Sequence, residues 1–435
     1  MQATSEPAPP PLVRAIGRWT LAALVINSIL GSGIFGLPDD IARLLGAAAP
    51  LAYLVAAAGV GIVMACFAEV GSQFSEAGGP YLYARRSFGR FAGVQMGWFA
   101  WLVRLTSAAA NAGIFVSYLG EFWRPATAPV TRPALLALVL GLLAAVNVRG
   151  VGAGAQLSNA FTAAKILALL AFVVAGLWLV GGRVAVGPSS AGPENWMSAV
   201  LALVFAYGGF EAALMPTGEV KDPRRDTPFA LFVALATCTI LYSTIQVVVM
   251  GAHTDPGASD RPLADAARAF LGNAGARLVA LSALVSTYGY LTGQFVSVPR
   301  LTYALAKKRD FPPLFARVHE KFRTPHVSIL IYAAMVWALA VYGSFIWNVI
   351  LAAVARLFTY GVVCAALIRL RTTQPGADAF RLPFGRLLAT AGMAFCLVLA
   401  TQMSAEHVRI VLVVAGMGLV SWLLSRRGTK EPLAS

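Results

Sequence analysis

Charged residues are scarce in this sequence of 435 residues, because Asp, Glu, Lys and Arg together make up only 12% of it. A soluble globular protein carries about 25%, so the scarcity excludes the string of soluble domains that the length alone would suggest. Hydrophobic residues make up 58% of the chain. Apolar runs of about 20 residues, the length that crosses a bilayer as a helix, recur throughout. The sequence therefore predicts one all-α integral membrane domain.

Cysteine and histidine are rare too, at four residues each. The cysteines lie inside apolar runs, which excludes a disulfide framework and metal-ligand spacing; they are Cys66, Cys238, Cys364 and Cys396. No P-loop sequence is present, which argues against ATP hydrolysis. No catalytic constellation is present either. We therefore expect a protein that is not an enzyme and that uses no cofactor or metal.

Acidic residues are outnumbered by basic ones, 19 to 34, and the net charge is +15. Such a balance is typical of nucleic-acid-binding proteins, but here the basic residues stand between the apolar runs and form no single stripe. Positively charged cytoplasmic loops account for the same excess. We expect lipid around the chain and no nucleic-acid partner.

The apolar runs predict twelve transmembrane helices. Most lysines and arginines then fall in loops on one side, which places both termini in the cytoplasm of what we expect to be a bacterial inner-membrane protein. The predicted organisation is a tail (1–15), a ten-helix transport core (16–370), two further helices (371–425) and a second tail (426–435). The predicted helices are 17–44, 49–75, 89–122, 133–149, 155–181, 195–219, 227–251, 276–307, 325–343, 346–370, 385–403 and 406–425, with a loop and a short surface helix over 252–275.

The first predicted helix is interrupted at Gly31-Ser32-Gly33. Glycine is a poor helix former and is free to adopt unusual backbone angles. Unwound backbone at membrane depth is tolerated where it is buried in protein or lines a cavity. The free amides and the positive dipole end of the second half-helix would suit a carboxylate.

The sixth predicted helix has a counterpart at Gly208-Gly209. Carbonyl groups at the end of its first half would suit an ammonium group. Interrupted helices at matching places in two halves indicate a transporter site and, here, a five-plus-five inverted repeat. The alternative is close helix packing, which small residues permit without any ligand.

At these residues the sequence resembles the amino acid–polyamine–organocation (APC) family of permeases, which have a leucine-transporter-like fold. Five segments carry the resemblance, and their spacing fits twelve helices. They are Gly31–Pro38, Glu76–Tyr83, Phe205 to Glu211 with Glu219–Arg225 after it, Arg300–Ala306, and Asp310–Pro313.

The resemblance implies roles for residues at both breaks. Residues of the first break would meet the substrate carboxylate or its neighbours, and those of the sixth helix would offer backbone and a pocket wall for the ammonium group and the side chain. Glu211 would connect the sixth helix to a gate or pocket. The implied substrate residues are Ile29, Ser32, Gly33, Phe205, Ala206 and Gly208.

Lys165 lies within the fifth predicted helix, and a charge at that depth is costly and functional by default. In sodium-independent members of the family that the chain resembles, a lysine here takes the place of a sodium ion beside the broken first helix. The resemblance therefore suggests proton coupling. A permanent cation bonded to unwound carbonyls is the alternative.

Three further polar residues lie within predicted helices. Arg104 either binds a second substrate carboxylate as a fork or pairs internally with Glu69 or Glu211. Arg356 would reach a gate or pair with a carboxylate. Gln294 would hydrogen-bond the substrate or join two helices.

These observations predict a secondary active transporter for an amino acid or related amine, working by alternating access. The predicted pocket around Phe205 and Tyr207 is apolar and aromatic, which favours a neutral amino acid. Arg104 leaves an acidic substrate as an alternative, and Glu211 leaves a cationic substrate as another. We expect coupling to protons or exchange for another amino acid. The rivals are a channel, a membrane enzyme and a non-transporting sensor on the same scaffold.

Overall fold

The structure is a computed structural model that describes residues 15–74, 78–150, 154–180, 186–187, 190–214, 219–252, 259–374 and 379–426. The side chains of 154–164, 180 and 426 are not described. Parts of the predicted tails (1–14 and 427–435) and Glu76-Ala77 of the loop motif lie outside these residues.

Helices form almost all of the described chain. In order they are α1 (Arg18–Ile29), α2 (Gly33–Leu45), η1 (Gly46–Ala48), α3 (Ala49–Ser72), α4 (Gly79–Phe88), α5 (Arg90–Leu119), η2 (Arg124–Thr127), α6 (Thr131–Arg149), α7 (Gly154–Val180), α8 (Pro193–Tyr207), α9 (Phe210–Ala213), α10 (Pro223–Ala252), α11 (Pro262–Lys307), η4 (Pro313–Ala316), α12 (His326–Tyr342), α13 (Phe345–Thr373), α14 (Gly385–Ala400) and α15 (Ala405–Arg426).

Eight segments within the described part of the chain are long and apolar enough to cross a membrane, and three shorter apolar helices accompany them. The eight are Gly33–Ser72, Arg90–Leu119, Thr131–Arg149, Pro193–Ala213, Pro223–Ala252, Pro262–Lys307, Phe345–Thr373 and Ala405–Ser425. The chain is therefore an integral membrane protein in its architecture. Twelve spans and the inverted repeat stay predictions.

Proline and glycine set many of the helix ends. The helices α8, α10 and α11 begin at a proline, where the missing N–H would have no helical partner anyway. Gly272, with φ 68° and ψ −165°, interrupts α11, so the predicted short helix before residue 276 is joined to the long one across a kink.

One described helix, α4, stands where the sequence predicts only a loop. It starts at Gly79-Pro80, and Arg85 and Arg86 lie in its last turn, where positive charge favours the helix dipole. Its polar composition gives it no membrane-length apolar run, which is why the hydropathy pattern does not reveal it.

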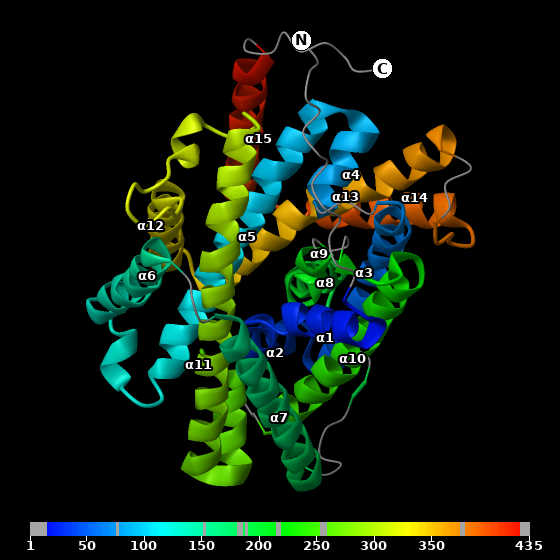
Figure 1. Cartoon of the computed structure of the whole chain (residues 1–435). Coiled ribbons are helices and arrows are strands. Elements are labelled where there is room, and N and C mark those ends of the chain that lie inside the picture. The colour runs from blue at the N-terminus through cyan, green and yellow to red at the C-terminus, as the bar shows by residue number, and fades with distance from the viewer. Residues whose placement is uncertain are drawn as a thin grey trace, which may run out of the picture.

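The interrupted helices lie in the middle of the molecule (Figure 1). The half-helix α1 packs against α10 and α9, and α2 packs against α8. The neighbouring helix α5 packs against both α11 and α13, α14 packs against α13, and α15 packs against α5. The two breaks are therefore held together at the core.

Candidate substrate site

The first break lies between Ile29, where α1 ends, and Gly33, where α2 begins. The backbone turns away from helical angles at Leu30 (φ −70°, ψ 78°), which frees carbonyl groups at the end of α1. Lys165 Nζ donates to two of them, at 2.7 Å from Leu30 O and 3.2 Å from Asn27 O. The Tyr242 hydroxyl donates to a third, Ile29 O, at 3.1 Å.

The second break lies at Gly208 and Gly209, between α8 and α9. Gly209 has φ 112°, a conformation that favours glycine. A Cβ atom there would lie 2.2 Å from the carbonyl oxygen of Ser28. The absence of a side chain thus lets the sixth predicted helix touch the backbone of the first at the point where both are open.

A buried ion pair stands next to the second break. Arg356 Nε lies 3.0 Å from Glu211 Oε1, and the other oxygen of Glu211 accepts the Gly209 N–H at 2.8 Å. The Arg356 guanidinium carbon lies 5.5 Å from the centre of the Phe205 ring, within cation–π range. Glu211 therefore caps the start of α9 and holds an arginine of α13 at the same time.

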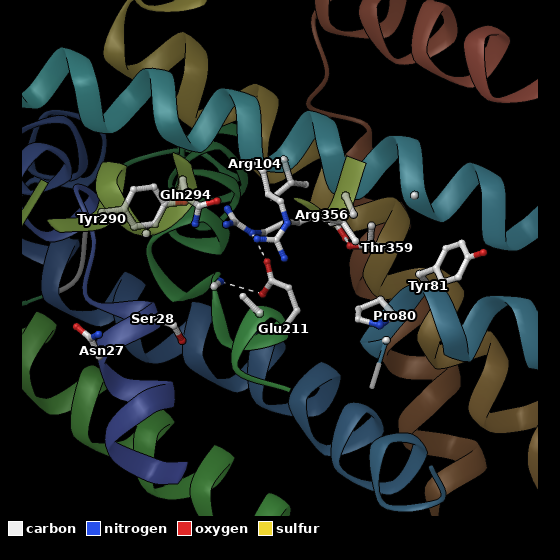
Figure 2. Close-up of a pocket in the computed structure, with 18 of the residues that line it drawn as sticks. Asn27, Ser28, Pro80, Tyr81, Arg104, Glu211, Tyr290, Gln294, Arg356 and Thr359 are labelled. Atoms are coloured by element: carbon white, nitrogen blue, oxygen red, sulfur yellow. Dashed lines mark hydrogen bonds and ion pairs between the residues drawn. The ribbon is translucent and has the colours of Figure 1, made fainter. Parts of the chain in front are cut away.

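A cavity of about 530 Å³ opens beside this pair. Figure 2 shows side chains from several helices converging on it. Five of the residues singled out in the sequence line it: Arg104, Lys165, Glu211, Gln294 and Arg356. Residues next to the first break, Asn27 and Ser28, and Gly209 of the second break line it too.

The remaining seven predicted site residues do not line this cavity. The start of α2 and the end of α8, where most of them lie, are in direct contact: a Cβ on Gly33 would lie 3.0 Å from Ala206 Cα. The Tyr207 hydroxyl donates to the Tyr53 carbonyl at 3.0 Å. The seven are Ile29, Ser32, Gly33, Phe205, Ala206, Tyr207 and Gly208.

Arg104 lies on the cavity wall in α5. Its two predicted partners hold other arginines: Glu211 bonds Arg356, and Glu69 makes two hydrogen bonds to Arg371, at 2.7 and 2.6 Å. The Glu69 carboxylate also accepts the Leu382 N–H at 2.9 Å. Glu69 therefore joins α3 to α13 and to the segment that precedes α14, and it is not among the described residues that line the cavity.

The sequence reasoning missed Ser286 and Tyr290, which line the cavity with Gln294. The three are spaced four residues apart on α11, which puts them on one helix face. That spacing, read together with Gln294, is the signal that would have found them.

At the other end of the cavity, α4 is tied to the end of α11. The Tyr81 hydroxyl donates to Asp310 Oδ2 at 2.5 Å, and Arg90 Nε bonds Asp310 Oδ1 at 3.1 Å. Arg85 Nη1 donates to the Tyr81 oxygen at 2.7 Å. Burial, together with the bond to Asp310, raises the pKa of Tyr81 to about 12, so the phenol remains a donor at neutral pH.

Comparison with known proteins identifies the class to which this fold and cavity belong. The model of the amino acid permease family matches residues 16–419. The chain therefore belongs to the amino acid permease family, in agreement with the resemblance seen at the broken helices.

Characterised relatives are transporters. The chain is 25% identical to a methylthioribose transporter of Bacillus subtilis, over 96% of this chain and 94% of the relative. It is 26% identical to a serine/threonine exchanger of the same organism, over 74% and 76%. An uncharacterized transporter of Mycobacterium tuberculosis is 29% identical over 83% and 81%.

Proposed function

We propose that this chain is a secondary active transporter that carries a neutral amino acid across the bacterial cytoplasmic membrane by alternating access, coupled to protons and independent of sodium. The contact of Lys165 with the broken first helix carries the proposal. A fixed ammonium group on the Leu30 and Asn27 carbonyls leaves those oxygens occupied, so they are not available to a sodium ion.

The unwound backbone supplies the groups that a zwitterion needs. Among the described residues, no backbone acceptor bonds the N–H groups of Ser32, Gly33 and Ile34 at the start of α2. The positive end of a helix dipole favours a carboxylate there. These amides are buried against α8 in this conformation, so the proposal requires α2 and α8 to separate when the substrate binds.

The cavity gives the substrate a route to these groups. It connects the two breaks with Tyr81 and Lys308, which lie at the end of the molecule where basic loops predict the cytoplasm. The proposed conformation is therefore open toward the cytoplasm and closed where Gly33 meets Ala206.

Uptake by the purified chain in liposomes tests the proposal. Liposomes with an inward proton gradient and no sodium are expected to accumulate a labelled neutral amino acid above the level without a gradient. The same accumulation with no gradient, but only when amino acid is present inside, would favour exchange, which the serine/threonine exchanger among the relatives supports. Binding without any uptake would favour a sensor on the same scaffold.

An acidic substrate is the second candidate, supported by Arg104 on the cavity wall. Competition by glutamate and aspartate against the labelled amino acid tests it. Strong competition that disappears in Arg104→Gln, at unchanged stability, would favour the acidic substrate over the neutral one.

A further inference from the structure

The cavity holds a buried donor that has no partner in the described structure. Arg356 is 4% exposed; its Nε bonds Glu211, its Nη2 lies 3.4 Å from Ser107 Oγ, and its Nη1 has no hydrogen bond. A buried N–H group left unpaired lowers stability, and this one belongs to a residue of the cavity wall. A ligand that accepts a hydrogen bond would satisfy it.

The same cavity holds buried acceptors without partners. Gln294 Oε1 and Ser286 Oγ are both buried and make no hydrogen bond among the described residues. Both residues line the cavity from α11, and Arg356 lines it from α13. Figure 2 shows Gln294 and Arg356 on the cavity wall. Residues of the cavity wall therefore carry an unsatisfied acceptor as well as an unsatisfied donor, and both atoms are covered in this conformation.

We infer that Arg356 and Gln294 recognise an uncharged side chain that both accepts and donates a hydrogen bond, which is a hydroxyl or a carboxamide. This inference rests on the proposed amino acid transport and narrows its substrate class. A hydroxyl group accepts from Arg356 Nη1 and donates to Gln294 Oε1. A carboxamide does the same through its two ends.

Other side-chain classes fit this pair worse. An aliphatic side chain would leave both buried groups unpaired. A carboxylate would face the Gln294 oxygen and a guanidinium that Glu211 already neutralises at 3.0 Å. A cationic side chain would meet the Lys165 ammonium group on the wall of the same cavity.

Amino acids of matched shape test the inference on the full-length chain. Dissociation constants for threonine and valine, which have the same shape, and for asparagine, aspartate and leucine are measured by thermal shift in detergent. Threonine is expected to bind about tenfold more tightly than valine, and asparagine about tenfold more tightly than aspartate or leucine, since a site built for a hydrogen-bonding group rejects analogues that lack it. Valine binding as tightly as threonine, or aspartate as tightly as asparagine, would overturn the inference and leave amino acid transport standing. No response to any amino acid would overturn both.

Gln294→Met, which keeps the size and removes the polar atoms, assigns the effect to one residue. It is expected to weaken threonine binding about tenfold and to leave valine unchanged, so that the two bind alike. Gln95→Met is the matched control, because Gln95 Oε1 is also buried and unpaired but is not among the described residues that line the cavity. Unchanged discrimination in Gln294→Met would overturn the role of Gln294. The wild-type comparison decides the side-chain class even where a variant fails to fold.

Discussion

Lys165 Nζ lies 2.7 Å from the carbonyl oxygen of Leu30, so a side chain of α7 occupies the gap left by the broken first helix. The lysine is 6% exposed and lies on the cavity wall. Loss of its proton would remove the positive charge and one of its three N–H donors, which weakens its hydrogen bonds to the Leu30 and Asn27 carbonyls. The state of one ammonium group is thereby linked to the conformation of the break.

Replacement of Lys165 by Ala is expected to abolish the stimulation of uptake by a pH gradient, because the group that would respond to protons is gone. Uptake in proteoliposomes with and without the gradient measures this, and a folded chain in detergent shows that the structure survives. Lys221→Ala, at an exposed position outside the cavity, is the control and should keep the stimulation. An unchanged response to the gradient in the Lys165 variant would refute proton coupling through this residue.

Substitution of Gly209 by Ala is expected to destabilise the chain and to stop transport. The positive φ costs about 1–3 kcal/mol for a residue with a side chain, and the new Cβ would collide with Ser28 O at 2.2 Å. Thermal melting in detergent and uptake in liposomes measure the two effects. Gly361→Ala, where nothing lies within 4 Å of the new Cβ, should melt like the wild type; equal melting of both variants would contradict the close approach of the two breaks.

The Glu211–Arg356 pair is expected to behave as a strongly coupled buried ion pair. Its side chains are 15% and 5% exposed, and removal of one partner from such a pair costs about 3–5 kcal/mol because the other charge is left uncompensated. Glu211→Gln and Arg356→Met should each lower the melting temperature, and the double variant should melt above the value that the two losses add up to.

The exposed pair Asp40–Arg43, at 3.2 Å with 25% and 55% exposure, is the control for this cycle. Its coupling should lie below about 1 kcal/mol. A coupling for Glu211–Arg356 no larger than that of the control pair would show that the buried pair does not hold α9 to α13.

Tyr81→Phe is expected to loosen α4, because it removes the phenol that bonds Asp310 and accepts from Arg85. Hydrogen exchange of the backbone amides over residues 79–88 measures this. The amides are expected to exchange about tenfold faster, because the loss of a charge-assisted hydrogen bond costs about 1.4 kcal/mol. Tyr303→Phe, on the neighbouring helix, is the control.

The hydrogen bond between Tyr81 and Asp310 in the wild-type chain is also expected to be independent of pH in the physiological range. Since the pKa of Tyr81 is raised to about 12, its contribution to stability is complete below about pH 10, the unperturbed value, and is lost only as the pH rises through 12. Exchange of α4 that accelerates between pH 6 and 9, after correction for intrinsic rates, would place the controlling group elsewhere.

The sequence predicted the positions of the two breaks because glycines that cluster inside an apolar run weaken the helix at that point. It predicted five cavity residues because charged or amide side chains are conspicuous inside apolar runs. It could not show that Gly33 packs on Ala206, or that Glu211 holds Arg356, because these contacts join segments far apart in the chain. It also passed over Ser286 and Tyr290, whose polarity is too ordinary to stand out before the cavity is known.

The residues that precede the first broken helix are hydrogen-bonded to residues that follow the second one. Ile16 N–H donates to Glu219 O at 2.9 Å, Lys221 N–H donates to Ile16 O at 2.9 Å, and Arg18 lies 3.5 Å from Asp226. These contacts form a clasp between the outer ends of the two interrupted helices, in addition to their contact at the breaks. We expect these contacts to couple any movement of α1 to the segment after α9, so a fluorophore placed beside Ile16 should report on a movement that begins about two hundred residues away in the chain.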